Sequence, residues 1–263
     1  MSSSRRKARL QILGLVALAV AAVASVWIAM SPAGPPPVLD TVTQAYENGL
    51  SAPSPQPTAS STVKAPALLT FGPGTKTLFF GDSWTFGMTA VPVTQGFAYL
   101  TAEQLQLNAT VMGGPGTGYL NPGPAKEGTY SERLNKVPAN LNPDLVVVQG
   151  SINDGNISPI DLPNAVNQFI AQLRVKFPTA QVVLVGPAPN AIPMDPSVTR
   201  LDNYLGQVAA NNSLNYISPV KGNWITAENV GTVIDAKTKH PTNAGHAVLA
   251  SKTVDALNAI KAQ

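Results

Sequence analysis

Ser83 and His240 have the side chains needed for attack on an acyl group, although they lie far apart in the sequence. Ser83 stands in the segment Gly-Asp-Ser-Trp, directly after a short apolar run. A serine hydroxyl is a weak nucleophile unless a neighbouring base takes its proton as it attacks a carbonyl carbon. Imidazole is the side chain best suited to this near neutral pH. The pair therefore predicts nucleophilic acyl transfer, provided that the fold brings the two side chains together.

The choice of base is narrow, because the chain contains two histidines, His240 and His246. His246 lies in the first turn of an expected helix, where an imidazolium would face the positive end of the helix dipole. His240 precedes that helix, in a loop next to Pro241. We therefore expect His240 to act as the base.

Acyl transfer also needs fixed hydrogen-bond donors for the tetrahedral oxyanion. A glycine-rich turn at residues 113 to 118 offers backbone amides that a ligand can approach closely. Asn153, in the segment Gly-Ser-Ile-Asn-Asp, offers a side-chain amide. The expected donors are the backbone amides of Ser83 and Gly116 and the side chain of Asn153. Gly114 and Gly118 remain alternatives to Gly116.

The elements that must position these groups follow from hydrophobic periodicity. Strands are expected at residues 77–80, 110–112, 145–148, 181–185 and 215–217, and helices at 95–105, 162–176, 196–210 and 243–262. The Val-rich runs at 145–148 and 182–185 lack polar alternation, which is typical of strands covered on both faces. Alternating strands and helices predict an α/β fold, a three-layer α/β/α sandwich with a central parallel sheet. Its site is expected at the carboxyl ends of the strands.

Four short segments at these strand ends resemble the conserved blocks of the SGNH/GDSL hydrolases. They are Gly-Asp-Ser after the first strand, the glycine turn after the second, Gly-Ser-Ile-Asn-Asp after the third, and His-Pro before the last helix. The resemblance spans residues 77 to 250 and implies the flavodoxin-like SGNH fold. It implies Ser83 as nucleophile, His240 as base, and an oxyanion hole formed by Ser83, Gly116 and Asn153.

Two positions depart from the pattern of that family. The family places an aspartate three residues before the histidine, where this chain has Lys237. Asp235, five residues before His240, is the candidate orienting acid; the alternative is a Ser-His dyad whose imidazole is held by a backbone carbonyl. Trp84 follows the serine where the family often has leucine, and we expect it to line the substrate crevice. Asp82 is expected to be structural, fixing the nucleophile loop.

The N-terminus predicts export. Residues 1–9 carry four basic residues, and residues 10–30 carry no charge, which as a helix is about 30 Å, enough to cross a bilayer. We expect residues 1–9 to be cytoplasmic, 10–30 to be a transmembrane anchor or a cleaved signal peptide, 31–68 to be a Pro/Ser/Thr-rich linker, and 69–263 to be the hydrolase domain. The domain would then stand outside the cell membrane, or be secreted if residues 1 to about 30 are removed.

Composition excludes several other functions. The chain has no cysteine, which excludes a thiol nucleophile, disulfides and thiolate metal sites. Lys and Arg total 17 against 14 Asp and Glu, so little basic excess is left in the domain for nucleic acid. No cofactor and no metal is expected, because the two histidines lack a usual ligand spacing.

These observations favour a serine esterase acting on a small-molecule, polysaccharide or lipid acyl ester. Two alternatives stay open: an acyltransferase that uses a sugar hydroxyl as acceptor, and an exported binding module without turnover. The sequence does not indicate an oligomeric state.

Overall fold

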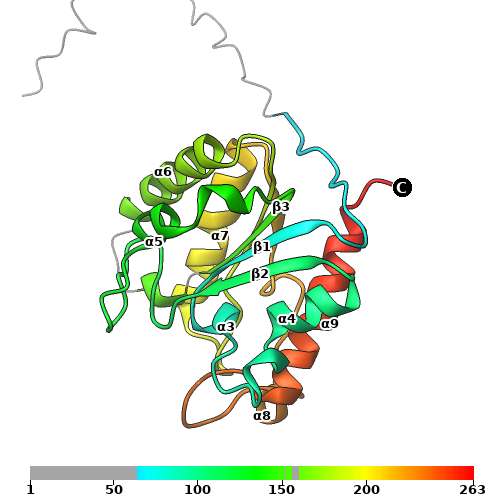
Figure 1. Ribbon diagram of the computed structural model, residues 1–263. Helices are drawn as coiled ribbons and strands as arrows, with labels where there is room; N and C mark the ends of the chain where they lie inside the picture. The colour runs from blue at the N-terminus through cyan, green and yellow to red at the C-terminus, as the bar shows by residue number, and fades with distance from the viewer. Residues whose placement is uncertain (1–63, 151, 156–159) are drawn as a thin grey trace, which may run out of the picture. The chain divides into compact units, whose positions relative to one another are not determined.

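The computed structural model describes residues 64–150, 152–155 and 160–263 (Figure 1). The expected cytoplasmic segment 1–9, the apolar segment 10–30 and most of the expected linker 31–68 lie outside these residues. Within the described ranges, no helix combines the length and apolar character needed to cross a membrane.

A five-stranded sheet forms the centre of the domain, with the strand order β2-β1-β3-β4-β5 and all neighbours parallel. The strands are β1 (Lys76–Gly81), β2 (Asn108–Gly113), β3 (Leu145–Gln149), β4 (Gln181–Val185) and β5 (Asn215–Ile217). All five expected strands are present, so the predicted parallel sheet is confirmed. The chain runs from β1 outward to β2 and then returns to the other side of β1 with β3. Ligands bind at such a switch point in open α/β sheets.

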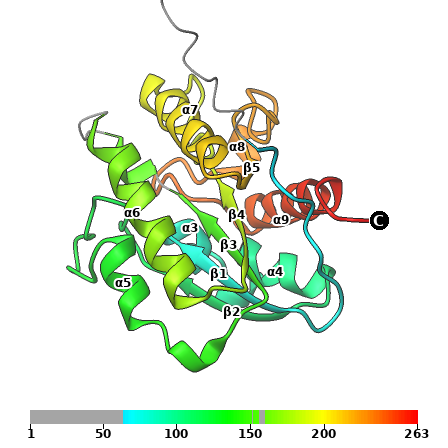
Figure 2. The same ribbon diagram turned by 90° about the horizontal axis from the view of Figure 1, so that it is seen from above.

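Helices cover both faces of the sheet (Figures 1 and 2). One layer holds α4 (Phe97–Gln104) and α9 (Asn243–Ala259), and the other holds α5 (Tyr130–Lys136), α6 (Asp161–Lys176) and α7 (Pro196–Asn211). The predicted three-layer α/β/α sandwich is therefore confirmed. Three α-helices of the described residues were not predicted: α3 (Ser83–Phe86), α5 and α8 (Val230–Val233).

The last helix ends three residues before the predicted boundary. Its final turn gives way at Ala259 because the following residues pair with the start of the domain. The amide of Leu69 donates to the carbonyl of Ile260 at 2.8 Å, and the amide of Ala262 donates to the carbonyl of Leu69 at 2.8 Å. These bonds hold the first residues of the domain against its last ones.

Two hydrophobic layers, one on each face of the sheet, form the core. Strand β1 contributes to both, because Phe79 faces the α4/α9 layer whereas Leu78 and Phe80 face the α5/α6/α7 layer. The ring of Phe80 packs edge-on against Tyr130 of α5, with the ring centroids 5.4 Å apart. Burial on both faces explains why the strands lack polar alternation. The same burial holds the carboxyl ends of the strands in place, and the candidate site is built from those ends.

Candidate active site

Ser83 and His240 meet at the carboxyl end of β1. The strand ends at Gly81, and the Asp82 carboxylate then caps α3 by accepting from the amide of Trp84 at 2.8 Å. Ser83 is the first residue of that helix and is 4% exposed. Its Oγ lies 2.9 Å from Nε2 of His240. This is the separation at which a serine can pass its proton to an imidazole.

The other ring nitrogen of His240 faces a backbone carbonyl, with Nδ1 2.7 Å from the oxygen of Thr238. A carbonyl oxygen can only accept a hydrogen bond, so Nδ1 must carry the proton. In the neutral ring, Nε2 then has a free lone pair directed at the Ser83 hydroxyl. The geometry is that of the Ser-His dyad, one of the two alternatives left open by the sequence.

The structure does not bring Asp235 to the imidazole, in contrast to its expected place as orienting acid. Its Oδ1 instead accepts from the Thr238 amide at 2.7 Å, the Thr238 hydroxyl at 2.8 Å and the Lys237 amide at 3.1 Å. These hydrogen bonds, those from Thr238 first, lower the pKa of the Asp235 carboxyl. The carboxylate closes a turn within its own loop, and the carbonyl of Thr238 takes the position at Nδ1.

The glycine-rich turn contains one backbone amide suited to an oxyanion. The amide of Gly114 donates to the carbonyl of Gly81 at 2.9 Å, and that of Gly118 donates to the carbonyl of Asn121 at 2.8 Å. Among the described residues, the amide of Gly116 has no such acceptor. Gly116 has a φ of 73°, in the left-handed region that glycine adopts without strain. These contacts favour Gly116 over its two neighbours.

Asn153 connects the third strand to this turn. It lies in the 3-10 turn Ile152–Asp154 after β3, and its Nδ2 donates to the carbonyl of Thr117 at 2.8 Å. A primary amide has two N–H donors, and Thr117 is the acceptor of one bond from Asn153 among the described residues, so a second N–H is available to a ligand. The Ser83 amide is likewise at the first position of a helix, where it has no intrahelical acceptor. The three expected donors thus come from the ends of β1, β2 and β3.

The neighbouring Asp154 fixes the far end of the turn. Its carboxylate accepts from three consecutive backbone amides: those of Tyr119 at 2.9 Å, Leu120 at 3.1 Å and Asn121 at 3.0 Å. Asp154 is 1% exposed. Its role is therefore to position the turn.

Asp82 is fully buried beneath the nucleophile. Burial raises the pKa of its carboxyl to about 7, although hydrogen bonds to Trp84 and Gln149 oppose the rise. Gln149, the last residue of β3, donates from Nε2 to Asp82 Oδ2 at 3.3 Å and accepts from the Thr85 hydroxyl at 2.8 Å. Asp82 therefore has the structural position expected of it, inside the loop that presents Ser83.

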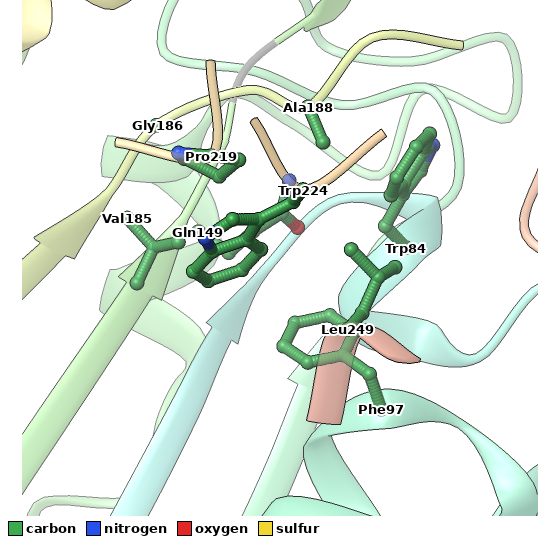
Figure 3. A pocket seen from close by; sticks show the side chains of 9 residues that line it. All are labelled: Trp84, Phe97, Gln149, Val185, Gly186, Ala188, Pro219, Trp224 and Leu249. Carbon is green, nitrogen blue, oxygen red and sulfur yellow. The ribbon is translucent and has the colours of Figure 1, made fainter. Parts of the chain in front are cut away.

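Trp84 points into a small apolar cavity beside α3 (Figure 3). The cavity has a volume of about 10 Å³, and Trp84 is 4% exposed. Such a volume holds about one water molecule. The residues lining it are Trp84, Phe97, Gln149, Val185, Gly186, Ala188, Pro219, Trp224 and Leu249. Trp84 thus lines a small, partly open cavity, whereas the sequence led us to expect a substrate crevice.

His246 is buried and forms hydrogen bonds to both ends of the segment between α3 and α4. Its Nδ1 accepts from the amide of Phe97 at 3.2 Å, and its Nε2 lies 3.0 Å from the carbonyl of Met88. One nitrogen accepts and the other donates, which requires the neutral ring. Burial, the largest cause, lowers the pKa of His246. His246 is thereby distinguished from His240, as expected.

Two groups near the site were missed in the sequence: Gln149, and Arg133 on the unpredicted helix α5. A backbone carbonyl at the imidazole was one of the two alternatives, but the sequence did not identify Thr238 as the residue that supplies it. Gln149 carries no sequence signal. Helix α5 does carry one, because Thr129 and Glu132 form a capping box, with each side chain bonded to the other's backbone amide. That Thr-x-x-Glu pattern would have located the helix and its buried arginine.

Comparisons with known proteins identify the family and the fold. The model of the GDSL-like lipase/acylhydrolase family matches residues 79–248. A search of the curated proteins found no match. Among solved structures, a putative lipolytic protein of the G-D-S-L family from Desulfitobacterium hafniense aligns with a TM-score of 0.57 at 12% identity, covering 68% of this chain and 98% of the other.

Two carbohydrate esterases share the fold. The acetyl-xylooligosaccharide esterase Axe2 of Geobacillus, solved as a mutant, aligns with a TM-score of 0.56 at 17% identity over 72% of this chain and 96% of its own. A family two carbohydrate esterase from Cellvibrio japonicus gives 0.56 at 20% identity over 72% and 62%. With the family model matched over most of the domain, and the serine and histidine in contact, the chain belongs to the GDSL-like lipase/acylhydrolase family and is an ester hydrolase.

Proposed function

We propose that the chain hydrolyses carboxylic O-acyl esters through a Ser83-His240 dyad and an acyl-enzyme. The observation that carries this proposal is the line of contacts from Ser83 Oγ to His240 Nε2 at 2.9 Å and from His240 Nδ1 to the carbonyl of Thr238 at 2.7 Å. It gives the serine a base, and it gives the base a fixed tautomer. Those are the two conditions for activating a serine hydroxyl.

In the first half-reaction, Ser83 Oγ forms a bond to the acyl carbon and its proton passes to His240 Nε2. The oxyanion is held by the amides of Ser83 and Gly116 and by the second N–H of Asn153. The bond to the alcohol oxygen then breaks, and the imidazolium returns the proton to that oxygen. Water repeats the sequence on the acyl-enzyme, so that the acid leaves and Ser83 regains its proton.

The carbonyl of Thr238 replaces a carboxylate as the partner of the imidazolium. It is neutral, so it fixes the orientation of the ring but stabilises the positive charge less than an aspartate would. We expect turnover to be slower than in an otherwise similar site with an aspartate at Nδ1. A carbonyl partner is nevertheless compatible with hydrolysis, because serine proteases that lose the orienting carboxylate keep residual catalysis.

For substrate, we propose a short O-acyl ester on a carbohydrate. Support comes from the carbohydrate esterases among the structures with this fold. In the alternative reaction, a sugar hydroxyl takes the acyl group from the acyl-enzyme in place of water. The enzyme would then be an acyltransferase. Adding an oligosaccharide and analysing the products separates the two, since transfer would yield a new ester instead of free acid.

The decisive test is hydrolysis of p-nitrophenyl acetate, butyrate and octanoate by the full-length chain purified in a mild detergent. Ser83→Ala and His240→Ala are each expected to lower kcat by about 10⁴-fold or more. Ser251→Ala serves as the matched control, because Ser251 is an exposed serine within α9. Equal rates for wild type and Ser83→Ala would exclude this mechanism.

We further propose that the domain acts outside the cell membrane, held there by residues 10–30. The support is the basic cluster before an uncharged segment long enough to cross a bilayer. In intact cells, a protease added outside should then degrade the domain and leave the N-terminus protected. Protection of the domain in intact cells, with degradation only after lysis, would contradict this location.

A further inference from the structure

Arg133 is a buried arginine that joins the nucleophile strand to the oxyanion turn. It is 7% exposed and lies on α5, one of the helices in the α5/α6/α7 layer on one face of the sheet. Burying a guanidinium is costly unless its donors are all satisfied. Among the described residues, the acceptors of its hydrogen bonds are neutral oxygens, so an ion pair does not explain its burial. Its hydrogen bonds instead connect separate segments of the site.

Its hydrogen bonds run to three separate segments of the site. Nη1 donates to the carbonyl of Gly81 at 2.7 Å and to the hydroxyl of Thr117 at 2.8 Å. Nη2 donates to the carbonyl of Met112 at 2.7 Å. Gly81 is two residues before the nucleophile, and Thr117 follows Gly116 directly. One planar fork therefore spans the ends of β1 and β2 and the turn between β2 and α5.

The guanidinium itself is held in place from the opposite side. Its central carbon lies 4.7 Å from the centroid of the Phe80 ring and 5.7 Å from that of Tyr130. Both rings are fully buried, and the Tyr130 hydroxyl donates to the carbonyl of Gln149 at 2.8 Å. A planar cation stacked on buried aromatic rings has little freedom to move.

Thr117 is held from two sides. Its hydroxyl accepts from Arg133 and donates to the carbonyl of Gly114 at 2.7 Å, and its own carbonyl accepts from Asn153 at 2.8 Å. The peptide unit before Thr117 joins it to Gly116, whose own N–H lies one peptide unit further back in the turn. Any shift of Thr117 therefore moves both Gly116 and Asn153 relative to Ser83.

From these contacts we propose that Arg133 is a positioning residue, whose guanidinium holds Thr117, and with it the Gly116 amide, at the distance from Ser83 that the tetrahedral oxyanion requires. The inference rests on the proposed hydrolytic function. The hydrogen bonds of Arg133 run to Gly81, Met112 and Thr117, not to Ser83 or His240, so it acts through the turn. A misplacement of about 1 Å at such a site can cost a hundredfold in rate.

The experiment compares two pairs of variants in the full-length chain. Arg133→Lys keeps the charge, but an ammonium cannot reproduce the planar fork. Thr117→Val removes the hydroxyl that accepts from Arg133, and Thr117→Ser restores it. Arg174→Lys is the matched control, because Arg174 is an exposed arginine on α6 whose Nη2 donates to the carbonyl of Asn212.

The measurements are kcat and KM for p-nitrophenyl acetate, inhibition by phenylboronic acid, which forms a tetrahedral adduct on an active serine, and the midpoint of thermal unfolding. We expect Arg133→Lys to lower kcat by about 10- to 100-fold and to weaken boronate binding in parallel, with KM changed less than threefold. Thr117→Val should lower kcat by about tenfold and Thr117→Ser by less than threefold. Arg174→Lys should leave the kinetic constants, the boronate inhibition and the unfolding midpoint unchanged.

A purely structural Arg133 would give a different result. In that case Arg133→Lys and Thr117→Val would unfold at lower temperature while kcat and boronate affinity stayed within threefold of Arg174→Lys, and the inference would fall. If Arg133→Lys does not fold, the two Thr117 variants decide alone. Wild type without turnover or boronate binding would instead overturn the proposed function itself.

Discussion

The two halves of the site are built in different ways. Ser83 and its surroundings are buried, and they are braced by side chains from other elements: Gln149 from β3 and Arg133 from α5. His240 stands at the end of a surface loop, residues 235–240, whose contacts are mostly with its own backbone. The proposed oxyanion donors therefore lie in a fixed environment, whereas the proposed base is positioned by a local turn. This arrangement suits catalysis by preorganised donors, because those donors must not move as charge develops.

The base loop is nevertheless anchored at its far end. The hydroxyl of Thr89 donates to the carbonyl of Pro241, and the side-chain amide of Asn243 makes two bonds to the backbone of Val91, at 3.0 and 2.8 Å. His246 adds its bonds to the same segment before α4. The turn before His240 is local, but the helix after it is fastened to the segment that follows the nucleophile.

We expect the largest effect of a substitution in the buried half of the site, which contains Ser83, and there at Asn153. Asn153→Ala removes one oxyanion donor and also the bond that holds Thr117, so kcat should fall by about 10²- to 10³-fold with little change in KM. Steady-state kinetics on p-nitrophenyl acetate measures both constants. Asn258→Ala is a suitable control, because Asn258 is an exposed asparagine in the last turn of α9, at the opposite end of that helix from His240. If Asn153→Ala raises KM and leaves kcat unchanged, the amide binds the substrate in its ground state and does not stabilise the oxyanion.

Much of the half of the site around Ser83 could be predicted from the sequence, but part of it could not. The five strands follow from apolar runs, and Ser83 and Asn153 follow from the strand ends. The choice of Gly116 among three glycines depends on which amides already have acceptors, and a sequence does not show this. Helix α5 has seven residues, too few for its periodicity to stand out, so Arg133 was missed. The capping box was the available signal.

For the base half, sequence reasoning chose the right histidine to meet Ser83 but could not choose its partner. The candidate Asp235 and the carbonyl of Thr238 are three residues apart. Which of them reaches Nδ1 depends on the turn conformation, set by three bonds to one carboxylate oxygen and by Lys239 with a φ of 60°. A carbonyl is present at every residue, so its direction cannot be inferred from residue type.

A second prediction concerns the buried carboxyl of Asp82. Its pKa of about 7 lies above the ordinary value of 3.8, so between these values the folded chain keeps a proton that the unfolded chain has released. Its contribution to stability is therefore complete in acid and is lost as pH rises toward 7. Asp82→Asn should remove that slope, about 1 kcal/mol per pH unit in this window.

Thermal unfolding of wild type and Asp82→Asn at pH 5, 6, 7 and 8 tests this. The difference between the two midpoints should shift in favour of the variant from pH 5 to 7 and level off by pH 8. Asp195→Asn is the control, because hydrogen bonds to Ser197 lower the pKa of that exposed carboxyl, so its contribution is constant above pH 5. Parallel curves for wild type and Asp82→Asn would show that Asp82 is ionised throughout.

The smallest effect is expected at Asp235, and it separates the dyad from a triad. Asp235→Asn keeps an oxygen that can accept from the Lys237 amide and from the amide and hydroxyl of Thr238, so the turn should survive and kcat should stay within about threefold of wild type. Asp235→Ala loses all three bonds and should lower kcat by about tenfold through a misplaced His240.

A triad predicts the opposite order, because its aspartate acts by charge. Replacing the orienting aspartate by asparagine in a serine protease lowers kcat by about 10⁴-fold. A comparable loss in Asp235→Asn would mean that the loop rearranges when substrate binds and brings the carboxylate to Nδ1. The base half of the site would then differ from the nucleophile half in mobility as well as in construction, since only the loop would have to move for catalysis.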